Sequence, residues 1–143
     1  MLLGEFHCAA DGEKLRMPAE WRAELGEGLT LTRGIERCLF IYPAAEWRRL
    51  VEKMEGRLPL TSREARMFAR LIFSGALACA PDPEGNIPLP GLLRQYAGIG
   101  DEAIIVGLYT HVEVWSPERW QEVRAQIDEE GAATAEALVH LNI

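Results

Sequence analysis

The sequence contains no long apolar run, so it offers nothing that would cross a membrane as a helix. None of its apolar stretches approaches the roughly 18 residues that a bilayer requires. Residues 1–6 have neither the basic start nor the apolar core of a secretory signal peptide. The 143 residues, 48% hydrophobic and 26% charged, are typical of a globular protein that buries a core without disulfides or metals. We therefore expect a cytoplasmic protein without a membrane partner.

Cysteine is scarce, and its spacing disfavours a disulfide framework or a zinc site. Cys8, Cys38 and Cys79 form an odd set without a CxxC pair, and each lies in a strand-like apolar run. His7 precedes Cys8, but adjacent side chains of a strand point to opposite faces and do not converge on one ion. We interpret the cysteines as reduced packing residues, and we expect neither a metal nor a cofactor.

The residue patterns of common enzymes are also missing. Asp11 and Glu13 could form a carboxylate pair and Ser74-Gly75 a nucleophile turn, but no Ser-His-Asp set or phosphate-binding glycine loop surrounds them. We expect no catalytic residue and no small-molecule substrate.

Basic residues are not in excess, and a net charge of −7 argues at first against a nucleic-acid partner. The acidic excess is concentrated at one end, because residues 116–143 contain six acids and two arginines, which leaves 16 acids and 13 bases before them. Between Arg33 and Arg70 the balance inverts, with nine bases and five acids. A basic surface is compatible with this distribution, although solvated helix faces explain most such charges.

One order of features occurs twice, about 72 residues apart. For the first half we predict a strand at 4–8, a turn at 11–13, a strand at 15–18, a helix at 19–25, strands at 29–32 and 38–42, and a helix that begins at Pro43. For the second half we predict a strand at 76–79, a turn at 81–85, a strand at 87–90, a helix at 92–96, strands at 103–106 and 111–115, and a helix capped by Ser116. Pro18 thus matches Pro90, and Trp47 matches Trp120.

A connecting helix separates the halves. Thr61-Ser62-Arg63-Glu64 is a capping-box signal, and Ser74-Gly75 is typical of a helix end. We divide the chain into a first unit with its helix, a connecting helix, a second unit with its helix, and a C-terminal tail that follows a helix break at 128–131 and forms a short helix of its own: 1–57, 58–75, 76–130 and 131–143.

Each half alone has four short strands, too few to bury both faces of a sheet, so the halves should pack on each other. This predicts an α+β fold with a pseudo-two-fold repeat and short peripheral helices. Two of the helices carry an apolar stripe that we expect to be buried in the core or in a subunit interface: Trp47, Leu50, Val51 and Met54 in one, and Trp120, Val123 and Ile127 in the other.

Several strings, in this order and spacing, resemble those of the MraZ family over residues 1–127: Leu31-Thr32-Arg33-Gly34, Cys38 to Pro43 with Trp47 following, Leu58-Pro59-Leu60-Thr61, Phe73-Ser74-Gly75-Ala76 and Leu93 to Gly98. Members of that family are similar to a fused pair of AbrB-like units with a double-split, swapped-hairpin β fold. The resemblance implies a transcriptional regulator that assembles into a ring and binds direct repeats in double-stranded promoter DNA, upstream of the division and cell-wall gene cluster. It therefore also implies association with the nucleoid.

The family's DNA-binding signature is a D-x-x-x-R turn in each half, followed by an apolar residue and proline. In the first half Lys14 occupies the arginine position, and Asp11 precedes it by three residues instead of four. Lysine keeps the charge but lacks the planar fork that pairs with guanine. Arg16 could substitute, because it would share one strand face with Lys14. The alternative is two solvated charges on an edge strand.

In the second half Asp82 is retained, and Asn86 replaces the arginine. Asparagine can pair with adenine but releases no counterions, and Glu84 repels phosphate. Pro88 cannot donate to a strand ladder, which predicts an edge strand or an irregular one. The alternative here is a purely structural turn.

Weak contacts at two altered turns could suffice if several subunits act together in one ring. We expect the ring interface among four apolar side chains: Phe73, Leu138, Val139 and Leu141. The competing hypothesis is a ring-forming protein-interaction module with weakened or lost DNA binding.

Overall fold

The computed structural model describes residues 1–141, and in that range each half of the chain contributes four strands. The strands are β1 (Leu2–Asp11), β2 (Lys14–Arg16), β3 (Leu29–Arg33), β4 (Leu39–Pro43), β5 (Leu77–Cys79), β6 (Asn86–Pro88), β7 (Glu102–Tyr109) and β8 (Val112–Trp115). The helices are α1 (Arg22–Leu25), α2 (Ala44–Met54), α3 (Arg63–Ser74), α4 (Gly91–Ala97) and α5 (Pro117–Ala137), with short 3₁₀ turns at Ala19–Trp21, Ile35–Arg37 and Val139–Leu141.

The strands form one sheet in the order β5-β3-β4-β8-β7-β1-β2-β6, and every pair is antiparallel. The pairs β3–β5, β4–β8, β7–β1 and β2–β6 each join one half of the chain to the other. When strands β1 to β4 are exchanged with β5 to β8, every strand pair of the sheet maps onto a pair that is also present, except β1–β2. Its counterpart, β5–β6, does not form. The sheet is thus a nearly closed barrel with one seam. The predicted α+β class and pseudo-two-fold repeat are confirmed.

The seam follows from the sequence between β5 and β6. Pro81 and Pro83 lie there and have no main-chain N–H, so they cannot donate to a ladder. The matching segment of the first half is the β1–β2 hairpin, in which Asp11 pairs with Lys14. Pro88 lies in β6 at the end of the strand order, as the prediction of an edge strand required.

The barrel interior is filled by matching side chains of both halves. Leu15 and Ile87 face each other across the β2–β6 pair, and both are buried. Trp21, just before α1, is also buried, and its ring lies 4.9 Å edge-on from that of Phe6. Burial of such large apolar side chains contributes most of the folding free energy, at about 1.5–3 kcal/mol each.

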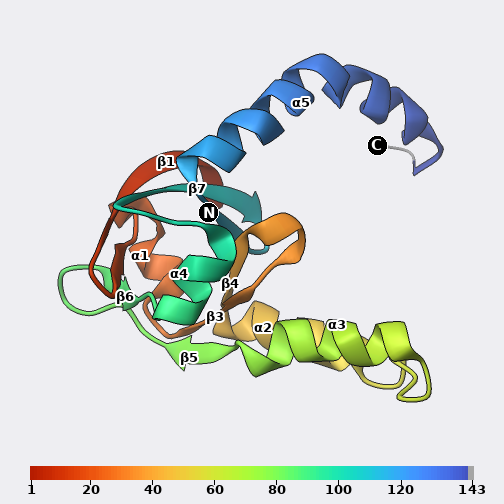
Figure 1. Ribbon diagram of the computed structural model, residues 1–143, viewed down its shortest axis with the longest axis horizontal. Helices are drawn as coiled ribbons and strands as arrows, with labels where there is room; N and C mark the ends of the chain where they lie inside the picture. Colours follow the sequence, from red (N-terminus) through yellow and green to blue (C-terminus); the bar gives the residue numbers. More distant parts are fainter. Residues whose placement is uncertain (142–143) are drawn as a thin grey trace.

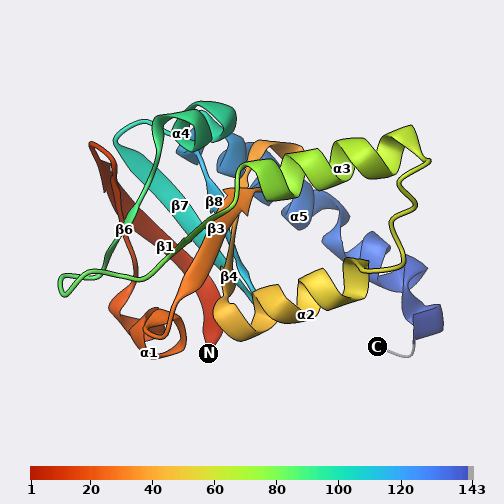
Figure 2. The same cartoon turned by 90° about the horizontal axis from the view of Figure 1, so that it is seen from below.

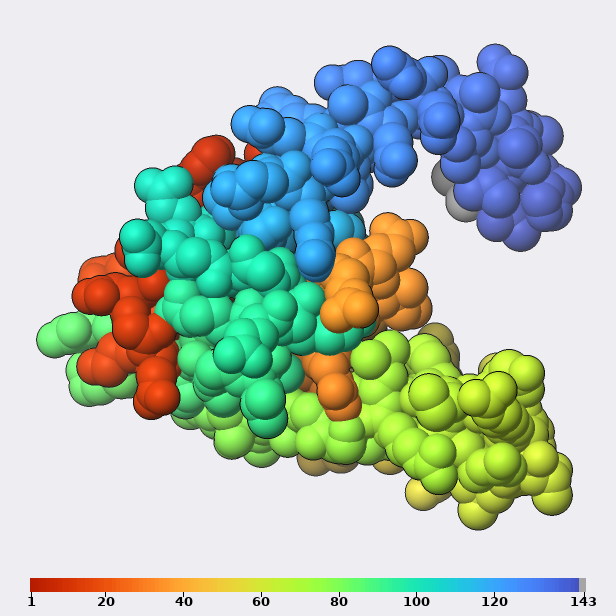
Figure 3. Space-filling view, viewed as in Figure 1, coloured from red at the N-terminus to blue at the C-terminus, as the bar shows by residue number. Residues whose placement is uncertain are grey.

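Two helical projections leave the barrel on the same side (Figures 1 and 2). The first is the helical arm, residues 44–74, in which α2 leads away from the barrel and α3 leads back to it after a loop at the far end (Figure 2). The second is α5, and an open notch separates it from the arm (Figure 3). No helix among residues 1–141 is long and apolar enough to span a membrane.

Hydrogen bonds from β3 anchor the arm. Buried Thr32 donates through its hydroxyl to the Ile72 carbonyl, and Arg33 donates to the Leu71 carbonyl at 3.0 Å and to the Arg70 carbonyl at 3.1 Å. These acceptors are in the last turn of α3, where helix carbonyls lack partners within the helix. At the other end of α3, the Ser62 hydroxyl accepts from the main chain of Ala65, which confirms the predicted helix start, while Glu64 accepts from the Ser62 hydroxyl and the Ser62 main chain donates to Pro59.

The first two turns of α5 are fixed to the barrel, and the rest projects. Trp120 is buried and donates through Nε1 to Glu5 at 2.7 Å, and Arg124 pairs with the same carboxylate at 3.2 Å. Ile127 is 52% exposed. Within a single chain, the apolar stripe of α5 is therefore covered only as far as Val123. The stripe of α2 is half-buried along its length.

Several local expectations were wrong. The helix break at 128–131 does not form. One glycine in a helix costs roughly 1 kcal/mol relative to alanine, and the alanine and glutamate residues around Gly131 favour the helix enough to offset this cost. Asp11 belongs to β1 and not to the turn, and β1 extends well beyond the expected 4–8. Pro43 ends β4 and caps α2 from outside it, while Cys38 precedes β4. Residues 142–143 of the expected tail lie outside the described residues.

The Thr32 contact gives a stability prediction. Thr32→Val keeps the shape of the side chain but leaves the Ile72 carbonyl without its donor, so we expect unfolding to become easier by about 1–3 kcal/mol in a urea titration. Thr30→Val makes the same change at another buried position of β3 and should cost less. Equal losses in the two variants would contradict a specific role for the Thr32 hydroxyl.

Candidate nucleic-acid interface

The polar face of the β2–β6 ribbon gathers the predicted site residues. Arg16 is the register partner of Asn86, and Lys14 is that of Pro88. Leu15 points into the core, so Lys14 and Arg16 lie on the same outer face, as predicted. The predictions treated the two turns as separate sites, and strand pairing joins them into one.

A shallow pocket of about 300 Å³ marks this surface, lined by Ala9, Asp11, Lys14, Arg16, Glu84 and Asn86. Four of the five predicted site residues therefore surround one hollow. The charged side chains of the lining are two cations and two carboxylates, so the net charge of the pocket is close to zero. Among residues 1–141, neither Lys14 nor Arg16 forms an ion pair within 4.0 Å, which leaves both cations available to a ligand.

The first turn, residues 11–14, is a tight hairpin with Gly12 and Glu13 at its tip. Gly12 has a φ of +60°, a left-handed conformation that glycine adopts without strain. The Glu13 carbonyl accepts from the main chain of Leu89 at 2.6 Å, so the second half of the chain braces this turn.

The second turn, residues 82–86, is organised by Asp82. Its Oδ1 accepts from the main-chain N–H groups of Glu84 and Asn86, each at 2.9 Å, and its Oδ2 lies 3.5 Å from the Asn86 side-chain nitrogen. The hydrogen bond from the Asn86 main chain holds the pKa of the Asp82 carboxyl below its ordinary value. Asp82 therefore shapes the turn and is absent from the pocket lining, whereas Asn86 reaches the shared pocket.

Sequence reasoning missed two arginines that bind these turns. Arg94 of α4 donates to the carbonyls of Ala10 and Gly12, and Arg22 of α1 donates to the Glu84 carbonyl at 3.0 Å. The two arginines are 72 residues apart, the period of the repeat. That coincidence was the available signal.

A second cluster, which we call the aromatic cluster, contains Phe40, Tyr42, Trp47, Phe73 and His111. His111 stacks on Tyr42 with ring centroids 4.9 Å apart, and Trp47 contacts Tyr42 at 5.9 Å and Phe73 at 5.8 Å. The cluster therefore ties the β7–β8 turn to both helices of the arm.

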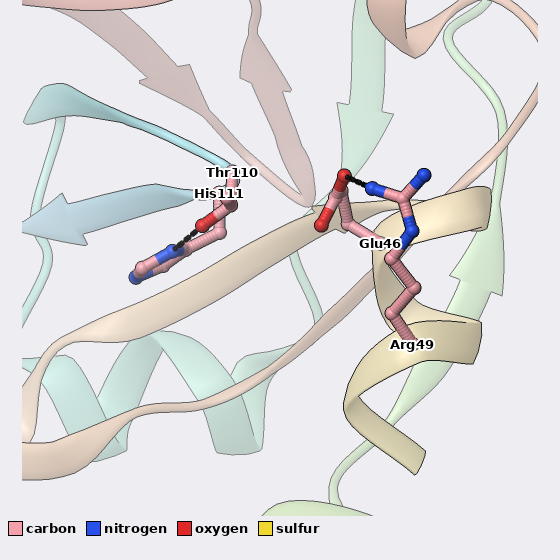
Figure 4. Close-up of polar contacts among 4 residues, drawn as sticks. All are labelled: Glu46, Arg49, Thr110 and His111. Carbon is pink, nitrogen blue, oxygen red and sulfur yellow. Dashed lines mark hydrogen bonds and ion pairs between the residues drawn. The ribbon is translucent and has the colours of Figure 1, made fainter. Parts of the chain in front are cut away.

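Two polar side chains lie near His111, Thr110 beside it and Glu46 on α2 (Figure 4). Thr110 Oγ1 lies 3.0 Å from His111 Nδ1, and Glu46 of α2 pairs with Arg49 at 2.5 Å. Burial lowers the pKa of His111, and the Glu46 carboxylate opposes this shift.

The cysteines are consistent with packing residues. Burial raises the pKa of the Cys8 thiol to about 11 and raises the pKa values of Cys38 and Cys79 as well, which disfavours the reactive thiolate. Across residues 1–141, no three His, Cys, Asp or Glu side chains are grouped closely enough to hold a metal ion.

Known sequences identify the family. A family model described as "MraZ protein, putative antitoxin-like" matches twice, over residues 1–71 and 72–142. The chain belongs to the MraZ family. The transcriptional regulator MraZ of Desulfitobacterium hafniense strain Y51 is 43% identical over 144 positions, with 100% of both chains covered. Those of Moorella thermoacetica and Roseiflexus castenholzii are each 41% identical, with 100% and 99% of both chains covered.

Membership in the MraZ family confirms the resemblance noted from the sequence and the repeat, which begins again at residue 72. The relatives are named as transcriptional regulators and not as enzymes, and this chain is accordingly a transcriptional regulator.

The His111 contact predicts a pH dependence of stability. A histidine whose pKa is lowered on folding takes up a proton more readily in the unfolded chain, so the stability it contributes is lost as the pH falls below about 6.5. We expect His111→Phe, which retains the stacking on Tyr42, to flatten the fall in unfolding free energy between about pH 6.5 and pH 5. His7→Gln removes an exposed imidazole and should keep the wild-type slope. A parallel slope in His111→Phe would sink this assignment.

Proposed function

We propose that the chain regulates transcription by binding double-stranded promoter DNA through the polar face of the β2–β6 ribbon. The observation that carries the proposal is the grouping of Lys14, Arg16 and Asn86 on one outer face, where neither cation has an ion-pair partner among residues 1–141. The β2–β6 pair lies at the end of the strand order, where a sheet edge is open on one side, and the major groove of B-DNA admits paired β-strands.

The three side chains have different parts in this proposal. Lys14 contacts phosphate and contributes affinity through counterion release. Arg16 offers the planar fork that pairs with the O6 and N7 atoms of guanine, and Asn86 offers the amide that pairs with adenine. Because Arg16 and Asn86 are register partners, the two contacts would fall on neighbouring base pairs. Asp11 and Asp82 shape the surface around them.

The carboxylates weaken each single site, so the proposal includes a ring of identical subunits that binds several direct repeats together. Several weak sites in one rigid assembly gain affinity from their high effective concentration. The expected target is the promoter of the division and cell-wall gene cluster, and such binding would associate the protein with the nucleoid.

Charge complementarity supports contacts between copies at the two helical projections. The arm, residues 44–74, has seven basic residues and four acids, whereas α5 has six acids and two arginines. Both expose apolar side chains that suit a head-to-tail interface: Phe73 at 40%, Ile127 at 52%, Leu138 at 42%, Val139 at 68% and Leu141 at 54%. We propose that α5 of one copy packs against the arm of the next. We also propose the division of the chain into units at 1–57, 58–75, 76–130 and 131–143, the last boundary of which falls inside α5.

One experiment tests the DNA contact directly. Lys14→Ala with Arg16→Ala removes two cations and the guanine contact, so we expect binding to the DNA upstream of the protein's own gene to fall at least tenfold, about 1.4 kcal/mol, in a gel-shift assay at fixed salt. The double variant Lys53→Ala with Arg57→Ala removes two charges from the arm and, once light scattering has shown that it keeps the wild-type mass, should weaken binding less. If the two double variants weaken DNA binding equally, the β2–β6 ribbon is not the DNA-binding surface.

Light scattering tests the assembly. Wild-type protein at micromolar concentration should have a mass several times that of the 16.0 kDa chain. Ile127→Asp with Leu138→Asp places charges in the proposed interface and should yield smaller species, whereas Leu92→Asp, at a position of α4 that is 82% exposed, should leave the mass unchanged. A monomeric wild type would refute the ring.

The competing function is a ring that binds other proteins and has lost DNA binding. The specific observation in its favour is the pair of carboxylates, Asp11 and Glu84, in the same pocket as Lys14 and Arg16. Retention on heparin at low salt, and a mass increase on adding promoter DNA, separate the two. An intact ring that ignores DNA at low ionic strength would favour the protein-binding function.

A further inference from the structure

Each half of the chain supplies an arginine that binds the turn of the other half. Arg22 in α1 belongs to the first half and contacts the second turn, whereas Arg94 in α4 belongs to the second half and contacts the first turn. Since they are 72 residues apart, they occupy the same position of the repeat. We call them the turn arginines.

Arg94 makes the larger set of contacts. Its Nη2 donates to the carbonyls of Ala10, at 3.2 Å, and Gly12, and its Nη1 donates to the Gly100 carbonyl. Ala10 and Gly12 flank Asp11 directly, so one planar guanidinium fixes the main chain on both sides of that residue. With its donors directed at carbonyls, the side chain supports the turn instead of facing a ligand.

Arg22 supports the second turn in the same way. Its Nη2 donates to the Glu84 carbonyl, and its guanidinium lies against Gly85. Gly85 has a φ of +87°, which favours glycine, and a Cβ built on it would come within 2.7 Å of the guanidinium nitrogens and displace the Arg22 side chain. Gly85 in turn accepts from the main chain of Met17 at 2.9 Å.

We propose that Arg22 and Arg94 are positioning residues for DNA recognition, which set the main-chain geometry of the turns that present Lys14, Arg16 and Asn86. The proposal rests on the proposed DNA-binding function. Base discrimination requires donors and acceptors held in a fixed arrangement, whereas general attraction to phosphate tolerates movement. Loss of a turn arginine should therefore reduce the preference for the specific sequence more than it reduces binding to arbitrary DNA.

The test compares arginine-to-glutamine variants in the full chain. Arg119 is a matched control, because it also donates to a main-chain carbonyl of the other half, that of Arg37 at 3.0 Å, and to that of Tyr96 at 3.5 Å in its own half, but contacts neither turn. The probes are a duplex from the DNA upstream of the protein's own gene and a scrambled duplex of equal composition, and the measured quantity is the ratio of the two affinities at one salt concentration. We expect Arg94→Gln to lower this ratio about tenfold and Arg119→Gln to leave it within about twofold.

Amide hydrogen exchange supplies a readout that a general loss of stability would not reproduce. The Leu89 amide, bound to Glu13, reports on the first turn, and the Met17 amide, bound to Gly85, reports on the second. Arg94→Gln should accelerate exchange at the Leu89 amide about tenfold. Exchange at the Gly34 amide, which donates to Cys38 outside both turns, should not change. Arg22→Gln should do the same at Met17, and it serves as the second variant if Arg94→Gln does not fold.

The outcomes distinguish a failure of the positioning role from a failure of the proposed DNA binding. A falling affinity ratio together with exchange confined to one turn supports the proposal. The proposal is overturned if the wild type discriminates between the duplexes and the variant keeps the same affinity ratio. It is also overturned if amide exchange accelerates equally at Leu89 and Gly34. If the wild type itself does not discriminate between the duplexes, the proposed DNA function fails along with any positioning role, and the exchange rates then decide only whether the arginines order the turns.

Discussion

Strand pairing between the halves is the constraint on which the rest of the structure depends. The β3–β5, β4–β8, β7–β1 and β2–β6 pairs all cross from one half to the other, and only three pairs remain within a half. Neither half could satisfy its main-chain hydrogen bonds or cover its apolar face alone. The β2–β6 pair also brings Arg16 opposite Asn86, so the same exchange that completes the barrel assembles the candidate DNA-binding surface from two distant segments.

The repeat is symmetric in its framework and asymmetric at this surface. The first turn continues a regular hairpin and presents two cations, whereas the second turn follows a proline-containing loop and depends on Asp82 for its shape. Arg94 and Arg22 nevertheless support both turns from equivalent positions. The framework around the two turns is thus alike, whereas their charges are not equivalent. Lys14 and Arg16, which have no ion pair among residues 1–141, both lie in β2 next to the first turn.

Local patterns predicted the elements well because they depend on neighbours in sequence. The period of the repeat, the Ser62 and Ser116 caps and the edge position of Pro88 all follow from such rules. The errors arose where a signal was weak or the partner was distant. Gly131 was given too much weight against its helix-forming neighbours, and the union of the two turns depends on a pairing across some 70 residues. The contacts of Arg94 to Ala10 and Gly12 belong to the same class of long-range information.

The seam between β5 and β6 determines where the barrel first comes apart. Each of these strands is held on one side only, by three register pairs, whereas β1 and β2 have a strand on both sides. Thermal breathing should therefore begin at the seam and carry the second turn with it while the first turn stays fixed. A bound duplex would then be released in two stages, with its contact at Asn86 exchanging rapidly and its contact at Lys14 and Arg16 setting the residence time.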